Sequence, residues 1–459
     1  MSHSPSRQSR RHFLVDTAAK GLSLGAGLTI LADARSVSGS PANDKLSIAM
    51  IGVKGRGNKL AKGFLAREDC EISYVCDVNT AVGERRVGQY ATQQNRKPRF
   101  VQDFRKMLDD QSVDAVVIAT PNHWHAPATV WSCQAGKDVY IEKPVSHNIW
   151  EGRKMVESAR KYKRVVQAGT QSRSAPYCKE AKRYIEEGKL GRIHLCKVFD
   201  MKQQGNFTLP PNSDPPAGLD WDMWNGPAPE RPYNSKILLG GWQHLWNYSG
   251  GDAANDSSHQ LDLARWLVGV ELPKAVYCTG GRFDSEGDAQ TPDTQIASYE
   301  YDDMIMTFEM TLYTPYMLKS DRVLRDSDIF PHWPQNASRI EIYGSKGVMC
   351  LGRHGGGWQV FARPKSRKPV VAAQRYGRYP DPEHKQDFFN CIRNRGVPNA
   401  DIRESHLSVL LTHYANISYR LGGEKLLIDR KTEGFVNNDR AMQFYKRDYR
   451  RPWVVEEKV

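Results

Sequence analysis

A cluster of glycines behind a short apolar run is the first candidate for chemistry in this chain. The apolar run 46–51 leads into Gly52, Gly55 and Gly57, and a helical pattern follows over 60–65. This order predicts a strand, a glycine turn and a helix. Such a turn lets backbone amides and the helix N-terminus face a pyrophosphate, whose negative charge the helix dipole favours.

A carboxylate stands at the distance that dinucleotide binding requires. A second apolar run, 72–76, ends at Asp77, about twenty residues beyond the glycines. A carboxylate there binds ribose hydroxyls and repels a 2′-phosphate, so the spacing predicts NAD rather than NADP. Lys54 departs from the usual pattern, because a glycine at this position gives the pyrophosphate room. Either Gly55 restores that room, or Lys54 turns away and lends positive charge to the phosphates. The predicted cofactor residues of this turn are Gly52, Lys54, Gly55, Arg56 and Gly57.

Two further apolar runs continue the alternation of strands and helices. The run 114–119 leads into Thr120-Pro121-Asn122, and the run 138–141 leads into Glu142-Lys143-Pro144. Ligands of doubly wound sheets bind beyond the carboxyl ends of the strands. We therefore expect the cofactor to be bordered by Thr120, Pro121, Asn122, His125, Glu142 and Lys143.

These segments carry a family resemblance. The sequence from Gly52 to Gly57, Asp77, the segment 119–125 and Glu142-Lys143-Pro144 are similar to those of the Gfo/Idh/MocA oxidoreductases, especially the exported members. The resemblance extends over nearly the whole chain, through Gly250-Gly251, Asp220-Trp221-Asp222-Met223-Trp224 and the closing Tyr449-Arg450-Arg451-Pro452-Trp453. It implies an α/β Rossmann dinucleotide-binding domain followed by an α+β domain with an open, mostly antiparallel sheet. It also implies NAD(P) in the cleft between them and a sugar or cyclitol substrate.

The resemblance assigns catalytic roles to two residues. The family's lysine of the E-K-P motif corresponds to Lys143, beside the nicotinamide and the reacting hydroxyl, and its catalytic histidine corresponds to His259. The chemistry agrees with this assignment, because oxidation of an alcohol needs a group that accepts the hydroxyl proton, and a neutral histidine near its reference pKa does so. A lysine stabilises the developing alkoxide.

One catalytic position departs from the family. The segment 253–267 is predicted to be one helix that carries Asn255, His259 and Asp262 on a shared face. Family members usually have an aspartate four residues before the histidine, where this chain has Asn255, with Asp256 one position later. An amide cannot take a proton or raise the basicity of the histidine as a carboxylate does. Asn255 is therefore a candidate catalytic residue of a modified mechanism, and Asp262 is either the orienting carboxylate or a packing residue.

The second domain begins near residue 166, where alternating strand patterns replace the strand-helix order. Within it, the irregular segment 206–248 is rich in aromatic residues that either stack on a sugar ring or pack the segment. The candidate substrate residues are Gln171, Arg173, Trp246, Tyr248, Asp256 and His259. A second candidate binding loop spans 317–333 and offers Arg322, Arg325 and Asp328. Helices are expected over 384–395 and 406–421.

Composition limits the class of protein. The 459 residues exceed what one hydrophobic core usually organises, and 39% hydrophobic and 25% charged residues are typical of a folded, soluble protein. The net charge of +13 is scattered, so we expect no nucleic-acid partner. The eight cysteines form no CxxC pair and are expected to be buried free thiols. No metal is expected, because His406 and His413 lack a third ligand.

The N-terminus resembles a twin-arginine export signal. Arg10 and Arg11 precede a mildly apolar stretch, 17–31, that ends in Ala32-Asp33-Ala34. We expect a signal peptide over 1–34, a Rossmann domain over 45–165, a substrate and oligomerisation domain over 166–430, and a C-terminal extension over 431–459 that packs on both. The mature protein is expected to be periplasmic, without a membrane anchor, and homo-oligomeric.

Three functions agree with these features. The first is an NAD-dependent dehydrogenase that transfers hydride between the cofactor and a sugar, cyclitol or glycoside hydroxyl. The second is an NAD-dependent glycosidase or lyase, in which transient oxidation of the sugar acidifies a neighbouring C–H and the bound cofactor is regenerated in each turnover. The third is a sugar-binding protein without catalysis, which Lys54 and Asn255 make conceivable and the retained Lys143 and His259 argue against.

Overall fold

The computed structural model describes residues 45–283, 286–319, 323–324, 327–363, 367–368 and 370–459. The predicted signal peptide, and Arg322 and Arg325 of the second candidate loop, lie outside the described residues. By contacts, Lys45–Val459 forms one compact unit. None of the helices in these described ranges is long and apolar enough to cross a membrane.

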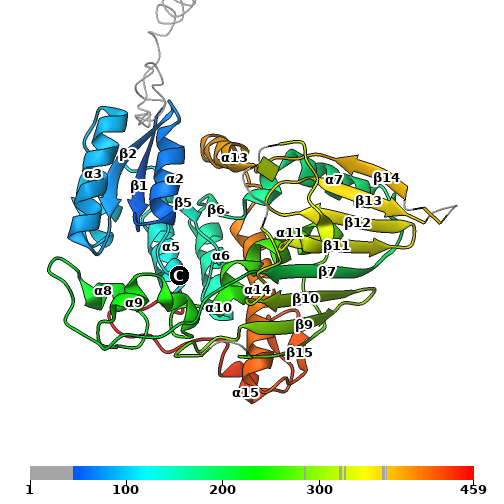
Figure 1. Ribbon diagram of the computed structural model, residues 1–459. Helices are drawn as coiled ribbons and strands as arrows, with labels where there is room; N and C mark the ends of the chain where they lie inside the picture. The colour runs from blue at the N-terminus through cyan, green and yellow to red at the C-terminus, as the bar shows by residue number, and fades with distance from the viewer. Residues whose placement is uncertain (1–44, 284–285, 320–322, 325–326, 364–366, 369) are drawn as a thin grey trace, which may run out of the picture. The chain divides into compact units, whose positions relative to one another are not determined.

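The first half of the chain builds a parallel six-stranded sheet in the order β3-β2-β1-β4-β5-β6, drawn in blue and cyan in Figure 1. Its strands are β1 (Leu46–Ile51), β2 (Cys70–Cys76), β3 (Arg99–Val101), β4 (Ala115–Ile118), β5 (Asp138–Ile141) and β6 (Val166–Ala168). Its helices are α2 (Arg56–Leu65), α3 (Thr80–Gln94), α4 (Arg105–Leu108), α5 (His125–Gln134) and α6 (Ile149–Lys161). This strand order defines a Rossmann domain and confirms the first part of the predicted fold class.

The central strands are apolar along their whole length because helices cover both faces of the sheet. All four residues of β4 and of β5 are buried, and so are five of the six residues of β1. The strand order reverses between β1 and β4, so their carboxyl ends diverge there. Ligands of doubly wound sheets bind at this point.

The second half builds a ten-stranded sheet in the order β14-β13-β12-β11-β7-β10-β9-β8-β15-β16. Its strands are β7 (Ile193–Met201), β8 (Ala275–Gly281), β9 (Thr294–Glu300), β10 (Ile305–Thr311), β11 (Arg339–Gly344), β12 (Gly347–Gly352), β13 (Trp358–Ala362), β14 (Val370–Arg375), β15 (Leu426–Asp429) and β16 (Gly434–Phe435). Only β7 and β10 pair in parallel within this sheet; its other described pairs are antiparallel. The predicted open, mostly antiparallel sheet is therefore confirmed.

Helices cover one face of this sheet. Helix α11 (Ser257–Val268) packs on β7, and α14 (Ile402–Arg420) packs on β8. Among the described residues, the second half also contains the helices α7 (Pro176–Glu186), α8 (Trp221–Asn225), α9 (Ser235–Leu238), α10 (Gly251–Asn255), α13 (Asp381–Asn394) and α15 (Asp439–Met442). Short 3-10 turns are η3 (Asn122–Trp124) in the Rossmann domain, and η4 (Gln171–Ser174), η5 (Gly241–His244) and η6 (Trp333–Gln335) after it. The opposite face is open, and apolar side chains such as Ile296 and Ile305 are about half exposed on it.

The C-terminal helices return to the core, as their helical spacing predicts. Helix α13, orange in Figure 1, lies beside the Rossmann domain, and its Phe388 and Phe389 share a core cluster with Phe64 and Tyr140. Helix α14 packs on both α6 and α11, so it joins the two sheets. The eight cysteines are buried and free, as expected.

Candidate active site

A cavity of about 650 Å³ opens at the carboxyl ends of β1 and β4. Its wall combines the Rossmann turns with segments of the second half of the chain. We call the part bordered by Gly52, Gly55 and Asp77 the cofactor end, and the part bordered by Lys143, Asn255 and His259 the substrate end. The volume is that of a site for a cofactor or a comparably sized ligand.

The glycine turn has the geometry that a bound pyrophosphate needs. Gly52 has a φ of +78°, a conformation that favours glycine, whereas a Cβ added at Gly55 would meet nothing within 4 Å. Gly55 precedes α2, a helix without a side-chain cap or an acidic residue in its first turn. The open backbone at Gly55 therefore supplies the room that Lys54 does not, and the N-terminus of α2 is free to bind an anion.

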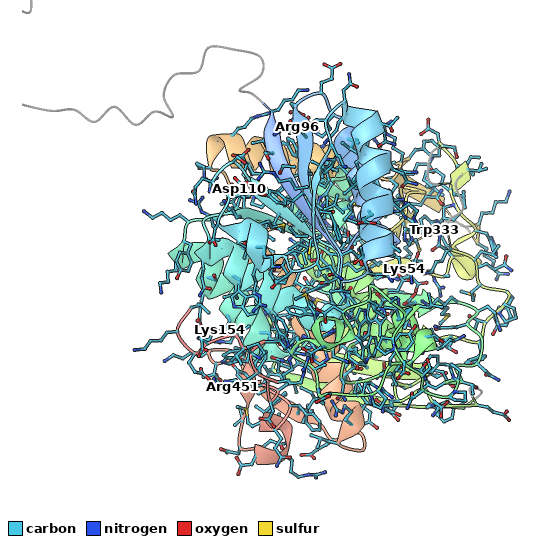
Figure 2. The ribbon with its side chains drawn as sticks, turned by 90° about the vertical axis from the view of Figure 1, so that its left-hand side faces the viewer. Lys54, Arg96, Asp110, Lys154, Trp333 and Arg451 are labelled. Atoms are coloured by element: carbon cyan, nitrogen blue, oxygen red, sulfur yellow. The ribbon has the colours of Figure 1, made fainter. Side chains whose placement is uncertain are left out.

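Gly57 and Lys54 differ in how far they agree with the prediction, since only Lys54 borders the cavity. Gly57 does not border the cavity; a Cβ there would lie 1.7 Å from the Gly52 carbonyl oxygen, so this glycine allows the helix to pack against the turn. Lys54 is exposed at the cavity wall, and Figure 2 labels it where the blue part of the chain meets the green part. Partial burial of its ammonium group lowers the pKa of Lys54, and the nearby Asp77 carboxylate partly offsets this decrease.

Asp77 directly follows β2 and borders the cavity. Its two carboxylate oxygens accept hydrogen bonds of 3.0 Å from the backbone amides of Val53 and Asn79, which fixes the orientation of the side chain. Burial raises its pKa, while these amides and Lys54 oppose the rise. A fixed acceptor at this position suits the ribose hydroxyls of NAD.

The loops after β4 and β5 complete the cofactor end. Thr120, Pro121, Asn122 and Glu142 border the cavity. Arg56 also borders it, and its Nε donates to Glu142 at 2.7 Å. This ion pair joins α2 to the loop after β5.

His125 lies behind this wall rather than in it. The histidine is buried, and its two ring nitrogens contact the Pro144 and Thr120 carbonyl oxygens at 2.6 and 2.9 Å. His125 therefore does not line the cavity as predicted. It instead holds together the two loops that do border the cavity.

Lys143 reaches the substrate end from the Rossmann domain. Its Nζ donates to the backbone oxygen of Asn255 and, at 3.2 Å, to the Asn255 side-chain oxygen. Burial lowers the pKa of Lys143, and Arg353 and Arg56 lower it further, whereas Asp256 and Glu142 raise it. The ammonium is thus held at the cavity wall by neutral acceptors, with its nearest carboxylates farther away.

His259 borders the same cavity from the second half of the chain. Burial, Arg353 and Lys143 hold its pKa well below the usual range, opposed by Asp256. The expectation of a histidine near its reference pKa is therefore wrong: the buried ring is neutral and weakly basic. Asp262 does not orient His259, because both of its oxygens bind the Arg173 guanidinium.

The helix expected over 253–267 is interrupted. Helix α10 ends at Asn255, and α11 begins at Ser257. Asn255 and His259 therefore do not lie one turn apart on a continuous helix. The break leaves the backbone oxygen of Asn255 free of helical bonding, and Lys143 binds it there.

Asp256, at this break, is surrounded by cations. Its carboxylate binds Lys319 directly, Lys202 at 3.4 Å and Arg353 at 3.3 Å. Although burial opposes it, Arg353 and the lysines hold the pKa of Asp256 well below its usual range. Asp256 also borders the cavity, as its candidate role as a substrate residue requires.

Asp200 and Asp252 lie behind Asp256. One oxygen from each of the three carboxylates lies within 4.8 Å of the others, and Lys202 Nζ binds Asp252 at 2.6 Å. Burial, Asp252 and Asp256 raise the pKa of Asp200 to about 7. The ammonium groups of Lys202 and Lys319 bind carboxylates of this cluster and balance part of its negative charge.

Four candidate substrate residues lie away from the cavity. Arg173 is 1% exposed and binds Asp262 with hydrogen bonds of 2.9 to 3.0 Å, so it is a buried structural ion pair. Gln171 is also 1% exposed, and its amide contacts the hydroxyls of Tyr140 and Tyr379. Gln171 thus supports a cavity residue, Tyr379, from behind.

The aromatic candidates mainly pack the irregular segment. Tyr248 is fully buried and donates to Asn225 at 2.7 Å, and Trp246 lies under the guanidinium of Arg420. Trp221 stacks on Trp224 with a centroid distance of 4.5 Å. Neither Trp246 nor Tyr248 borders the cavity.

Trp242, one of the aromatic residues of the irregular segment that could stack on a sugar, does border the cavity. The sequence reasoning missed other residues of the substrate end: Gln243, Arg353, His354 and Tyr379. Arg353 and His354 follow β12 and precede three glycines, 355–357, which all have positive φ. This glycine run was the one signal that marked the position, since it indicates a backbone that other residues rarely adopt. Trp242 and Gln243 come from the irregular segment 206–248.

Two consecutive segments of the chain match models of one family. Residues 46–170 match the model described as oxidoreductase family, NAD-binding Rossmann fold, and residues 178–308 match that of the family's C-terminal alpha/beta domain. Together the two models describe an NAD-binding Rossmann domain and a C-terminal alpha/beta domain of one oxidoreductase family. The chain belongs to the Gfo/Idh/MocA oxidoreductase family, as the sequence motifs indicated.

Curated relatives are similar over part of their length. Levoglucosan dehydrogenase of Pseudarthrobacter phenanthrenivorans is 27% identical over 259 residues, which cover 54% of this chain and 58% of the relative. The alpha-N-acetylgalactosaminidase of Shewanella oneidensis is 29% identical over 169 residues, 33% of this chain and 36% of the relative. The chain thus spans between about a third and somewhat more than half of the length of these relatives.

Solved structures share the fold over a larger part of the chain. A levoglucosan dehydrogenase in complex with NADH and levoglucosan has a TM-score of 0.62 and 19% identity, covering 83% of this chain and 99% of that one. An aldose-aldose oxidoreductase from Caulobacter crescentus has a TM-score of 0.62 and 16% identity, covering 84% and 100%. At these identities the likeness establishes the common fold.

Proposed function

We propose that the protein catalyses NAD-dependent hydride transfer at a hydroxyl-bearing carbon of a sugar, cyclitol or glycoside. The observation that carries the proposal is that Lys143, from the Rossmann domain, and His259, from the second domain, border one cavity with the ribose-binding candidate Asp77. The levoglucosan dehydrogenase among the relatives supports a carbohydrate substrate.

The chain's own groups have distinct roles in this reaction. Bound NAD supplies the hydride acceptor for the carbinol carbon. The neutral His259 ring takes the hydroxyl proton, and the Lys143 ammonium stabilises the alkoxide that develops as the proton leaves. In the reverse direction, the protonated ring returns the proton to the carbonyl oxygen. The depressed pKa of His259 disfavours storage of the proton on its ring, so release of the proton to solvent accompanies turnover.

A panel of sugars, cyclitols and glycosides with NAD tests this proposal. We expect NADH to accumulate with at least one member and the matching ketone to appear by mass spectrometry. Purified protein that binds NAD and converts no member of the panel, in either direction, would contradict the dehydrogenase proposal.

A glycosidase or lyase is the second candidate. The observations that favour it are the relative described as alpha-N-acetylgalactosaminidase and the neutral Asn255 beside Lys143. In this reaction the oxidised sugar loses a neighbouring proton and the leaving group departs, which forms a double bond. In the glycosidase, water then adds to that double bond. In both the glycosidase and the lyase, hydride returns from the cofactor to the sugar, so no net NADH forms. Cleavage of a glycoside without net NADH identifies this function, whereas NADH in equal amount to ketone identifies the dehydrogenase.

We further propose export by the twin-arginine pathway, with the mature chain beginning near Arg35. The motif Arg10-Arg11 before the mildly apolar stretch supports this proposal. Replacement of both arginines by lysine is expected to retain the protein in the cytoplasm, and unchanged export of that variant would contradict it.

A homo-oligomer is proposed on the open face of the second sheet. Tyr277, Ile296, Ile305 and Leu427 expose between 44% and 52% of their surface there, which is a favourable area for contact with a second copy. Light scattering of the purified protein measures its mass, and a monomer at all accessible concentrations would contradict the proposal.

A further inference from the structure

The side-chain amide of Asn255 can face Lys143 in two ways. Its oxygen accepts a hydrogen bond from an ammonium, whereas its NH₂ group repels one, and the two ends of the amide have nearly the same shape. A carboxylate at this position would need no such choice, because both of its oxygens accept. Lys143 itself favours the orientation with the oxygen toward its ammonium, and a second contact to the NH₂ end of the amide would strengthen that preference.

Gln243 makes that contact. Its Oε1 accepts a hydrogen bond of 3.0 Å from Asn255 Nδ2, while Asn255 Oδ1 accepts one of 3.2 Å from Lys143 Nζ. Both polar atoms of the Asn255 amide are thereby hydrogen-bonded, Oδ1 to Lys143 and Nδ2 to Gln243. With Gln243 oriented as it is, a flipped amide would place NH₂ against the Lys143 ammonium and oxygen against Gln243 Oε1, so two attractive contacts would become two repulsive ones.

The element that carries Gln243 also suits this role. Gln243 lies in η5, within the irregular segment 206–248, and borders the cavity together with Trp242. Asn255 is the last residue of the short helix α10, so the helix does not continue past it to restrain the side chain. A contact from outside the helix is what holds the amide.

We propose that Gln243 is a positioning residue that holds the Asn255 amide with its oxygen toward Lys143 Nζ. The inference rests on the proposed function, in which Lys143 stabilises the alkoxide. Through Gln243, the irregular segment 206–248 would then contribute to the reaction as well as line the cavity. The same contact explains how Asn255 can bind Lys143 at a position where a carboxylate is usual.

The experiment is a double-mutant cycle. Gln243→Met removes the acceptor at similar length, and Gln243→Glu keeps an acceptor as the matched control. Each is made in the unmodified chain and together with Asn255→Asp. The first measurement is the pKa of Lys143, from NMR titration of lysine labelled at the ε-carbon in the NAD-bound protein, with Lys143→Met to identify the signal. The second is kcat and KM on a converted substrate.

With Asn255 present, Gln243→Met is expected to lower the pKa of Lys143 and to reduce kcat about tenfold, the factor that one lost hydrogen bond of ordinary strength gives. KM and NAD affinity should stay within about twofold, because ground-state binding is not altered. Gln243→Glu should not lower the pKa of Lys143. With Asn255→Asp present, Gln243→Met should change the pKa of Lys143 and kcat little, because a carboxylate needs no orientation.

Equal effects of Gln243→Met in both backgrounds would overturn the inference, since they would mean that Gln243 only packs. So would an unchanged pKa of Lys143 in the Gln243→Met variant with Asn255 present. The NMR titration needs no substrate, which separates the inference from the proposed function. A pKa that shifts as expected, in a protein that converts no carbohydrate, would support the positioning and contradict the dehydrogenase.

Discussion

The two ends of the cavity are built in different ways. The cofactor end consists of three short segments that each directly follow a parallel strand, so Gly52, Asp77 and Thr120 are placed by the sheet itself. The substrate end gathers side chains from separate elements of both domains: the loop after β5, η5, the α10–α11 break and the turn after β12. The cofactor end relies on backbone geometry, whereas the substrate end relies on side-chain contacts and charge.

The comparison predicts that side-chain changes at the substrate end affect turnover and spare cofactor binding. Lys143→Met and His259→Ala should each lower kcat by roughly 10² to 10⁴, because both groups act mainly in the transition state. Their combination should cost less than the product of the two effects. Calorimetry with NAD should give nearly unchanged affinity. Intact turnover in both variants would remove the catalytic assignment.

The charge cluster behind the substrate end predicts a dependence of stability on pH. Burial and two neighbouring carboxylates raise the pKa of Asp200 to about 7, above the 3.8 of an exposed aspartate. Between these two pKa values the folded state therefore keeps a proton that the unfolded chain releases. The cost of ionising the buried Asp200 thus lowers the free energy of unfolding. This penalty is absent below about pH 4, grows as the pH rises, and is complete above about pH 7.

Asp200→Asn removes this penalty. Relative to the unmodified protein, the variant's free energy of unfolding should improve between about pH 4 and pH 7 by an amount on the order of a few kcal/mol. Urea unfolding at several pH values measures the difference. Asp222→Asn, at an exposed carboxylate, is the control and should show no such trend. A difference that is constant across this range would be incompatible with a protonated Asp200.

Two glycines of the same turn test the cofactor end, where the backbone decides. Gly57→Ala would bring a Cβ within 1.7 Å of the Gly52 oxygen, so we expect a loss of stability of about 1–3 kcal/mol. Gly55→Ala meets nothing within 4 Å and should leave stability nearly unchanged while it weakens NAD binding. Thermal unfolding and NAD titration of the pair check this contrast. Equal loss of stability in both variants would contradict the packing role of Gly57.

The smallest effect is expected at Asp77, the one side chain at the cofactor end with a predicted role in specificity. Asp77→Ala removes the acceptor for the ribose hydroxyls and the repulsion of a 2′-phosphate, so the preference for NAD over NADP should narrow about tenfold. Calorimetry with both cofactors measures the ratio. If the unmodified protein already binds the two equally, Asp77 does not select the cofactor.

The sequence by itself determined the Rossmann domain and most of the cofactor end. Buried parallel strands are continuous apolar runs, and the residues that follow them must lie at one edge of the sheet, so local pattern is sufficient to place Asp77 and Thr120. The family resemblance predicted that Lys143 and His259 act on the same substrate hydroxyl, and both residues border the cavity. Neither the break at Asp256 nor the depressed pKa of His259 is visible in the local pattern, which continues through this segment as a helix.

Only the tertiary structure decided the rest of the substrate end. Arg173 and Tyr248 carry chemistry that suits a sugar, yet long-range partners, Asp262 and Asn225, bury both away from the cavity. Gln243 and Arg353 are unremarkable in the sequence and become part of the site because the segments that carry them meet Asn255 and Asp256. Whether a polar side chain packs or binds depends on the partner it meets. That partner lies far away in the chain, beyond the reach of any local pattern.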